Sequence, residues 1–487
     1  MITRPTTLKL AALAISLSFA SCNLRAQTRS ASATATVIEP LLAAIEPAGI
    51  QRNIEKLVSF GTRHTLSDTS SETRGIGAAR RWIKSEMERC AATSGGRMTV
   101  AFDSHTRPAG GRIPQAVEIV NVVATLKGTA VPERVIVVSG HYDSRASDVM
   151  DATSDAPGAN DDASGSAAVL AMACAFAPHA FPATLVFMNV AAEEQGLLGA
   201  EHFAQRARVD KRNIIAMITN DIIGSPVGDQ GQRDDQQVRL FADGFSPLLK
   251  MFLDAQKAPQ NALQSPPSAE ADAAAQELRK SLEVIARSGG DDDTPTSQLG
   301  RYLKEAGEHY QPGVTVRLIT RRDRFLRGGD HLPFLERGFA AVRFTEPFEN
   351  FAHQHQNVRT ENGVQFGDLP QFVDYPYIAR VARINAAGLA SLALAPAAPA
   401  EVGIDVSGLT NDTRLVWKQA VTEDVAGYRI LWREPGSPVW QHREDVGAVS
   451  AYTLKGVSKD NFVFGVAARN AGGQTSLPVF AQPASPK

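Results

Sequence analysis

Histidine and acidic residues recur in five short segments of this chain, and together they make a set of side chains suited to binding a metal ion. The segments are 139–143 with His141, 158–165 with Asp161, the pair Glu193-Glu194, 219–221 with Asp221, and 351–355 with His353 and His355. Two imidazoles and several carboxylates suit zinc that keeps one coordination position open. A carboxylate that does not bind metal can then serve as a general base. This combination predicts a hydrolase.

The predicted strands explain how these distant segments meet. Buried strand patterns at 135–138, 184–190, 214–218 and 340–344 each end shortly before one of the segments. In an open parallel sheet, ligands bind at the carboxyl ends of the strands. We therefore expect these segments to share one edge of the sheet.

Each residue also has an ordinary structural explanation. Asp161 precedes a helix predicted to start near Ala163, where a carboxylate caps the helix or interacts with its dipole. The pair Glu193-Glu194 follows a buried strand, so solvated surface explains it poorly, and a nearby cation would relieve the repulsion between the two charges. The joint occurrence of such residues at separate strand ends favours a metal site.

Helix and strand patterns alternate along the first 394 residues. Helices are predicted at 39–57, 75–91, 166–176, 198–207 and 377–394, and a further strand at 117–123. This alternation predicts an α/β fold with a mostly parallel mixed sheet and helices on both faces. An irregular region at 228–327, with a helix at 276–287, is expected to build part of a substrate pocket.

The pattern changes after a Pro/Ala linker at 395–400. Short alternating strands at 414–417, 427–432 and 461–467 predict a small all-β sandwich. This segment resembles a fibronectin type III domain, with Trp417, Tyr428 and Trp432 at the expected core places. We expect domains at 27–396 and 397–487, the second serving as a spacer or binding a surface or polymer.

The N-terminus is typical of an exported protein. Arg4 and Lys9 precede an apolar run at 10–20, which predicts a signal peptide at 1–26 with cleavage after Ala26. A lipoprotein lipidated at Cys22 is the alternative. The protein is therefore expected in the periplasm or outside the cell, with no transmembrane segment in the mature chain.

Composition narrows the function further. The chain has 487 residues, 43% hydrophobic and 21% charged, with a formal net charge of −2, which argues against a general nucleic-acid binder. Besides Cys22, the cysteines are Cys90 and Cys174, so at most one disulfide is expected in the mature chain. Cys174 lies in an apolar helical pattern, which favours a buried thiol.

Four motifs resemble those of the co-catalytic two-zinc aminopeptidases, a family that includes bacterial leucyl aminopeptidase, aminopeptidase Y and the peptidase domain of glutamate carboxypeptidase. Their order and spacing agree from about residue 50 to residue 394. The motifs are Gly140-His141-Tyr142-Asp143-Ser144, the segment 157–165, the segment 191–199 around Glu193-Glu194, and Asn220-Asp221.

The resemblance implies a site with two zinc ions. Asp161 matches the carboxylate that bridges both ions. His141 and Asp221 would complete the ligands of one ion, and Glu194 with a late histidine those of the other. We favour His355 as that histidine.

The resemblance also assigns the remaining roles. Glu193 matches the general base, and Asp143 matches the carboxylate that orients the imidazole of His141. His353 is the alternative late ligand, because the residues that follow either histidine depart from the family pattern. His331 resembles a family position beside the substrate pocket.

The implied function is that of an exported zinc exopeptidase. An aminopeptidase, which cleaves N-terminal peptide bonds of peptides with a free N-terminus through a metal-bridging hydroxide, is the first interpretation. Carboxypeptidase action, a glutaminyl cyclase-like acyltransferase with one zinc ion, and a non-catalytic binding protein are the alternatives. Zinc content separates the peptidase, the cyclase and the binding protein. Release of a free amino acid from aminoacyl-nitroanilides, blocked by N-acetylation, separates aminopeptidase from carboxypeptidase action.

Overall fold

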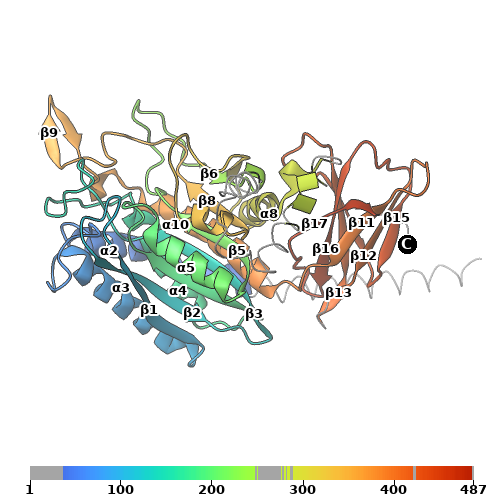
Figure 1. Cartoon of the computed structure of the whole chain (residues 1–487), viewed down its shortest axis with the longest axis horizontal. Coiled ribbons are helices and arrows are strands. Elements are labelled where there is room, and N and C mark those ends of the chain that lie inside the picture. Colours follow the sequence, from blue (N-terminus) through green and yellow to red (C-terminus); the bar gives the residue numbers. More distant parts are fainter. Residues whose placement is uncertain are drawn as a thin grey trace, which may run out of the picture.

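A large sheet with helices on both sides makes up most of the molecule, and two four-stranded sheets lie beside it (Figure 1). A two-stranded sheet of β9 (Arg359–Glu361) and β10 (Val364–Phe366) follows the large sheet in the sequence. The computed structural model describes residues 37–246, 289–420 and 424–484, with a few single residues between 249 and 285. The predicted signal peptide at 1–26, including Cys22, lies outside the described residues. Within the described part, no helix combines the length and apolarity needed to cross a membrane.

The large sheet has eight strands in the order β1-β2-β4-β3-β5-β8-β6-β7. The strands are β1 (Met98–Arg107), β2 (Val117–Leu126), β3 (Val131–His141), β4 (Ala183–Val190), β5 (Asn213–Asn220), β6 (Gln237–Phe241), β7 (Thr315–Ile319) and β8 (Ala341–Thr345). The four central strands, β4, β3, β5 and β8, are parallel. Antiparallel pairing joins β2 to β4 and β6 to β8. The predicted mixed, largely parallel sheet is confirmed.

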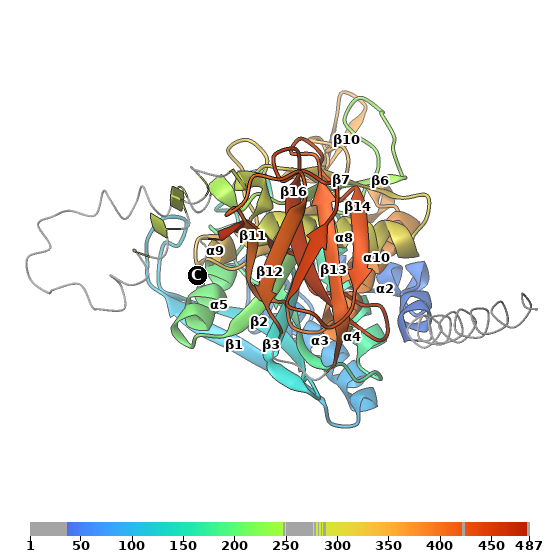
Figure 2. The same ribbon diagram turned by 90° about the vertical axis from the view of Figure 1, so that its right-hand side faces the viewer.

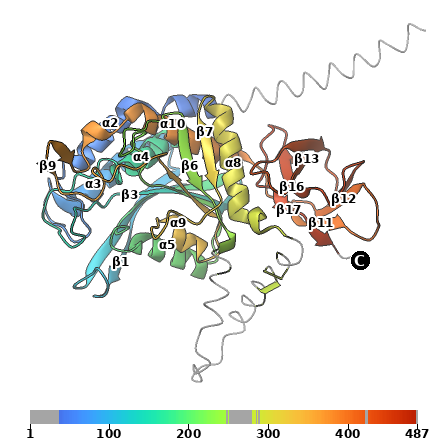
Figure 3. The same cartoon turned by 90° about the horizontal axis from the view of Figure 1, so that it is seen from above.

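Helices cover both faces of this sheet, as Figure 3 shows. One face carries α2 (Pro47–Val58), α3 (Gly75–Ala91), α4 (Ala163–Phe176), α8 (Pro295–Tyr310) and α10 (Tyr375–Leu394); the other carries α5 (Leu198–Val209) and α9 (His331–Leu335). A larger apolar core lies under the first group and a smaller one under the second. Helix α4 is buried along nearly its whole length, which explains why its sequence is apolar on all sides.

The N-terminal helix differs from its prediction. Residues 37–43 are helical, but the chain then breaks, and α2 begins at Pro47. Proline has no backbone N–H and is tolerated in the first turn of a helix rather than in its interior. The single helix predicted at 39–57 is therefore wrong. Half of the residues in the helix predicted at 276–287 lie outside the described part.

A disulfide connects two helices on the same face of the sheet. Cys90 on α3 is bonded to Cys174 on α4, at a sequence separation of 84 residues. The prediction of a free buried thiol at Cys174 is therefore wrong. The bond ties α3 to the helix that follows the segment containing Asp161.

The C-terminal strands form two four-stranded sheets that face the viewer in Figure 2. One sheet has the order β15-β12-β11-β18 and the other β14-β13-β16-β17. The strands are β11 (Ala400–Asp405), β12 (Thr413–Lys418), β13 (Val425–Arg433), β14 (His442–Val446), β15 (Ala451–Leu454), β16 (Val463–Asn470), β17 (Val479–Phe480) and β18 (Gln482–Ala484). Trp417 and Tyr428 pack together in the core between the sheets, with ring centroids 5.2 Å apart. The predicted all-β sandwich is confirmed.

Helix α8 makes polar contacts with the sandwich. Arg433 of β13 pairs with Asp293, just before α8, at 2.7 Å, and Arg301 of α8 pairs with the same carboxylate at 3.2 Å. The indole N–H of Trp440 donates to the side chain of Gln298 at 3.1 Å. Because Asp293, Arg301 and Arg433 are all buried, these ion pairs fix the sandwich to α8.

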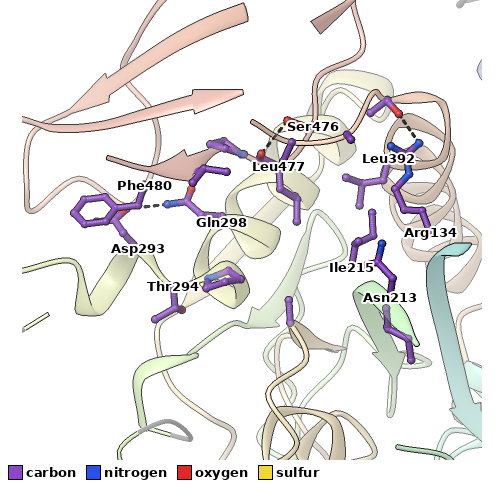
Figure 4. A pocket seen from close by; sticks show the side chains of 18 of the residues that line it. Arg134, Asn213, Ile215, Asp293, Thr294, Gln298, Leu392, Ser476, Leu477 and Phe480 are labelled. Carbon is purple, nitrogen blue, oxygen red and sulfur yellow. Dashed lines mark hydrogen bonds between the residues drawn. The ribbon is translucent and has the colours of Figure 1, made fainter. Parts of the chain in front are cut away.

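A cavity of about 700 Å³ remains beside these contacts (Figure 4). Its walls include Ile215 and Leu392 from the α/β part and Phe480 from the sandwich. At one end the guanidinium of Arg134 donates to the carbonyl of Ala395, at 2.5 Å. None of the predicted site residues lines this cavity.

Replacing Asp293 by alanine is expected to destabilise the protein, because it leaves the guanidiniums of Arg301 and Arg433 without their shared buried carboxylate. Breaking a buried ion pair by removing one partner costs about 3–5 kcal/mol. Urea unfolding followed by circular dichroism measures the loss. Asp291→Ala is the matched control, because Asp291 lies two residues away and is exposed. Equal midpoints for the two variants would contradict a role of Asp293 in this junction.

Candidate metal centre

The predicted site residues lie together at the carboxyl ends of the central strands. His141 is the last residue of β3, Asp221 follows β5 directly, and Glu193 follows β4. Asp161 lies in the segment before α4, and His355 lies in the loop after β8. The parallel strands thus bring to one edge side chains that are up to 214 residues apart in the sequence.

Six of these side chains form two groups of three. His141, Glu193 and Asp221 make one group, and Asp161, Glu194 and His355 make the other. Within each group the potential ligand atoms all lie within 4.8 Å of one another. Each group has the size and the mixture of nitrogen and oxygen donors that a zinc ion requires.

Asp161 connects the two groups. Its Oδ1 lies 3.1 Å from Nε2 of His141 in the first group, and its Oδ2 lies 2.9 Å from Nε2 of His355 in its own group. One carboxylate therefore faces both imidazoles with different oxygens. This is the arrangement that a bridging carboxylate between two cations needs.

Asp143 organises the neighbouring backbone. Its carboxylate accepts hydrogen bonds from the backbone N–H groups of Glu193 and Glu194, both at 3.2 Å, and from the hydroxyl of Thr65. Nδ1 of His141 lies 3.1 Å from the Asp143 carbonyl oxygen and 3.5 Å from its carboxylate. Asp143 thus holds the imidazole and the acidic pair in fixed positions, which is what a residue supporting metal ligands does.

The helix cap is Asp162, not Asp161. The Asp162 carboxylate accepts from the N–H of Gly165 at 3.0 Å, which caps α4, and also from the N–H groups of His141 and Ile222. It therefore links the start of α4 to the ends of β3 and β5. Asp161, one residue earlier across a cis peptide bond, has its carboxylate directed at the imidazoles instead.

Close packing at the start of α4 depends on glycine. A Cβ atom on Gly140 would come within 2.5 Å of the Gly165 backbone, and one on Gly165 within 2.2 Å of the Asn220 carbonyl oxygen. Any other residue at either position would push α4 away from β3 and β5. The glycines beside His141 and Asp161 in the motifs therefore set the spacing of the site.

The two late histidines have different surroundings. The ring of His353 stacks on Phe372, with centroids 3.5 Å apart. His355 lies against Asp161 and Glu194, at 2.9 Å from each. Its φ of +52° is a conformation that costs a residue other than glycine about 1–3 kcal/mol. Of the two histidines, His355 is therefore the one that lies among the candidate ligands.

Arg343 is a part of the site that the sequence analysis missed. Its guanidinium is fully buried and pairs with Asp221 at 2.8 Å and with Asp323 at 3.1 Å. Burial lowers the pKa of Arg343, but the two carboxylates outweigh it and raise the pKa above its ordinary value. His331 packs beside this cluster, 3.7 Å from Asp323. A charged residue inside the buried strand β8 was the signal that could have revealed it.

The site holds more acid than its own bases can neutralise. Burial raises the pKa of Glu193 well above its usual range, and the charges of Asp221 and Glu194 add to this against the opposing effect of His141. Burial and neighbouring acids likewise raise the pKa of Asp330 to about 8. Neither carboxylate oxygen of Asp330 has a hydrogen-bond partner among the described residues. Such an excess of buried carboxylates fits divalent cations at this place.

The site opens into a cleft of about 340 Å³. Asp161, Glu193, Glu194, Asp221 and His355 all line it. The irregular region at 228–327, which the sequence analysis expected to contribute to a pocket, adds Arg324, Leu326 and Arg327 to its lining. A small ligand in this cleft would therefore reach both groups of candidate metal ligands.

Comparison with known proteins identifies the family. The profile of peptidase family M28 matches residues 121–265. A probable zinc metalloprotease of Leptosphaeria maculans is 46% identical over 446 residues, which cover 92% of this chain and 97% of that protein. A probable zinc metalloprotease of Pyrenophora teres is 45% identical, over 90% of this chain and 86% of that protein.

Two kinds of solved structure are also similar. The LapA aminopeptidase of Legionella pneumophila is 18% identical, covering 73% of this chain and 74% of that one, with a TM-score of 0.48. A glutaminyl cyclase of Fimbriiglobus ruber is 16% identical, covering 71% and 94%, with a TM-score of 0.44. The full-length relatives decide the assignment: the chain belongs to peptidase family M28 and, with them, to the zinc metalloproteases.

Proposed function

We propose that the protein is an aminopeptidase with two zinc ions, which removes residues from the free N-terminus of peptides. One observation carries this proposal: two groups of three candidate ligands are joined by Asp161, which faces an imidazole of each. His141 and Asp221 would hold one ion, Glu194 and His355 the other, and Asp161 both. The donors are nitrogen and oxygen atoms only, which suits zinc at a catalytic site.

Bound zinc supplies Lewis acidity, which polarises a scissile carbonyl and lowers the pKa of water. The residues of the chain transfer the proton and position the reacting groups. Glu193 lies in the first group but is not needed as a ligand, so its carboxylate takes the proton of the attacking water and passes it to the leaving amine. Glu193 is half-buried and lines the cleft, so its carboxylate can reach a water molecule there. Asp143 holds the backbone of Glu193 and Glu194 and thereby positions both side chains.

Action at a chain end is supported by the size of the cleft. A volume of about 340 Å³ is at the low end of the range for small-ligand pockets. It accommodates one or two residues at the end of a peptide. We propose that this end is the N-terminus with its free α-amine, because the motifs resemble those of the two-zinc aminopeptidases.

Substrate blocking and metal analysis test the proposal together. The enzyme is expected to release the free amino acid from aminoacyl-nitroanilides, to lose this activity when the substrate is N-acetylated, and to contain two zinc ions per chain. One zinc ion with cyclisation of N-terminal glutamine would indicate a glutaminyl cyclase-like enzyme instead. Cleavage only at the carboxyl end would indicate a carboxypeptidase, and absence of zinc a binding protein.

We also propose export of the protein and a fibronectin type III-like domain at 397–487. The disulfide between Cys90 and Cys174 supports export, because such bonds persist in oxidising compartments. The two four-stranded sheets with Trp417 and Tyr428 in their core support the domain assignment. Fractionation of the native host, followed by N-terminal sequencing of the mature protein, tests export and cleavage after Ala26, with lipidation at Cys22 as the alternative.

A further inference from the structure

Four arginine side chains line the cleft at the metal centre. They are Arg112 from the loop between β1 and β2, Arg145 from the loop after β3, and Arg324 and Arg327 from the loop between β7 and α9. Three separate loops therefore bring positive charge to one small cleft. Positive charge gathered in one cleft attracts anionic groups of a ligand.

Two of the four pair with the acidic side chains of Glu349 and Asp323. Arg324 pairs with Glu349 at 3.1 Å, and Arg327 pairs with the same carboxylate. Burial raises the pKa of Glu349, but Arg324, Arg327 and Arg343 outweigh it and lower the pKa to about 2. Glu349 is therefore ionised at any ordinary pH, and these two arginines serve mainly to build the wall of the cleft.

Arg112 and Arg145 have no such partner. Nη1 of Arg112 donates to the backbone carbonyl of Glu194 at 2.6 Å. Arg145 donates to the carbonyls of Ala146 and Ser147 at 3.2 and 3.1 Å. Across the described residues, neither guanidinium lies within 4.0 Å of a carboxylate. The backbone contacts hold the two side chains in place while leaving their charge uncompensated.

The carboxylates of the metal centre do not remove this charge. Asp161, Glu194 and Asp221 are the proposed metal ligands, so in the loaded enzyme divalent cations neutralise them. A guanidinium has five N–H donors, and the backbone carbonyls use one in Arg112 and two in Arg145. The remaining donors suit a carboxylate, which a guanidinium binds with two parallel hydrogen bonds.

We infer that Arg112 and Arg145 bind a carboxylate of the peptide substrate, so that the enzyme prefers peptides with a negative charge close to the scissile bond. This inference rests on the proposed aminopeptidase function and adds a substrate class to it. The carboxylate can come from a Glu or Asp side chain or from the C-terminus of a very short peptide. The chemistry of recognition is the same for both sources.

Pairs of dipeptides that differ only in charge test the inference with the zinc-loaded enzyme. Glu-Leu-amide against Gln-Leu-amide probes a side chain before the scissile bond, and Leu-Glu-amide against Leu-Gln-amide one after it. Leu-Leu with a free C-terminus against Leu-Leu-amide probes the terminal carboxylate. At least one acidic member is expected to have a kcat/KM higher by about tenfold to a hundredfold, the range of a charge-assisted hydrogen bond. Equal kcat/KM values within all three pairs would overturn the inference.

Arginine variants then connect the preference to these side chains. Arg112→Gln and Arg145→Gln are each expected to reduce the acidic-to-neutral ratio of kcat/KM about tenfold, and Arg145→Lys to retain part of it, because lysine keeps the charge without the paired donors. Arg208→Gln is the matched control, since Arg208 is exposed at the end of α5 and does not line the cleft. An acidic preference that survives both glutamine variants would overturn the assignment to Arg112 and Arg145.

A binding measurement separates this inference from the proposed function. Calorimetric titration of the zinc-loaded Glu193→Gln variant with Leu-Glu and Leu-Gln reports recognition without turnover. Failure to cleave any dipeptide, together with tighter binding of the acidic member, would reject the aminopeptidase proposal and keep the carboxylate site. Cleavage of all dipeptides at equal rates, with equal binding, would reject the carboxylate site and keep the aminopeptidase.

Discussion

Replacing Glu193 by glutamine is expected to lower kcat by about 10²–10⁴-fold, the usual contribution of a general base, and to leave the zinc content unchanged. Glutamine keeps the volume and the polar contacts of the side chain but cannot accept the proton of the attacking water. The measurement is steady-state hydrolysis of an aminoacyl-nitroanilide, alongside zinc analysis of the same preparation.

The control for this variant is Glu133→Gln. Glu133 is an exposed glutamate of β3, in the same strand that ends at His141. It is expected to keep wild-type kcat. If Glu193→Gln kept full activity, Glu193 would not be the base. If it lost zinc together with activity, Glu193 would act as a ligand in the group that contains His141 and Asp221.

Replacing Asp161 by asparagine is expected to abolish zinc binding at one or both positions and to lower activity to background. Asparagine has nearly the same shape, but it carries no charge and only one oxygen, whereas both oxygens of Asp161 face imidazoles in the structure. A neutral amide also leaves His141 and His355 without the negative charge between them. Zinc analysis after dialysis measures the result.

Asp148→Asn and Asp162→Asn are the two control variants for this experiment, the first for zinc binding and the second for stability. Asp148 is exposed in the same loop and is expected to keep both zinc ions. Asp162 caps α4 and binds three backbone N–H groups, so its replacement should lower the melting temperature. Full zinc content in Asp161→Asn would refute the bridging role. If Asp161→Asn lowered the melting temperature as much as Asp162→Asn, Asp161 would also be needed for the stability of the fold.

The central strands of the large sheet could be predicted from the sequence because both of their faces are buried. Strands β3, β4 and β5 are covered on both faces, so their sequences are short apolar runs that can be recognised without knowledge of the tertiary structure. The strand β1 lies at the edge of the sheet, and its exposed residues, including Ser104 and Thr106, alternate with the half-buried Asp103 and His105. Its mixed composition gave no clear pattern, and it was not predicted.

Helix α8 was also missed, although it carries a recognisable start. Thr294 caps it by accepting from the N–H of Ser297, and Pro295 occupies the first position. These signals stand next to an acidic, glycine-containing segment that resembles a loop. The interruption of the apolar pattern by Gly300 and Gly307 adds to the difficulty. Both glycines lie where α8 packs closely on its neighbours.

At the metal centre, the residues that could be predicted are those at strand ends. His141, Glu193 and Asp221 follow recognisable strands, so topology alone places them together. The pairing of Arg343 with Asp221 depends on which strands are neighbours, β5 and β8, and these are about 120 residues apart in the sequence. The disulfide of Cys90 depends in the same way on helix packing, which no local pattern encodes.

The buried ion pairs between α8 and the sandwich have a consequence for how the enzyme meets large substrates. Turning the sandwich about residues 395–399 would separate Arg433 from Asp293 and break this buried ion pair. The junction therefore opposes such a turn. If the sandwich binds a surface or polymer, one of the two roles expected for it, that partner would meet the cleft from one preferred direction.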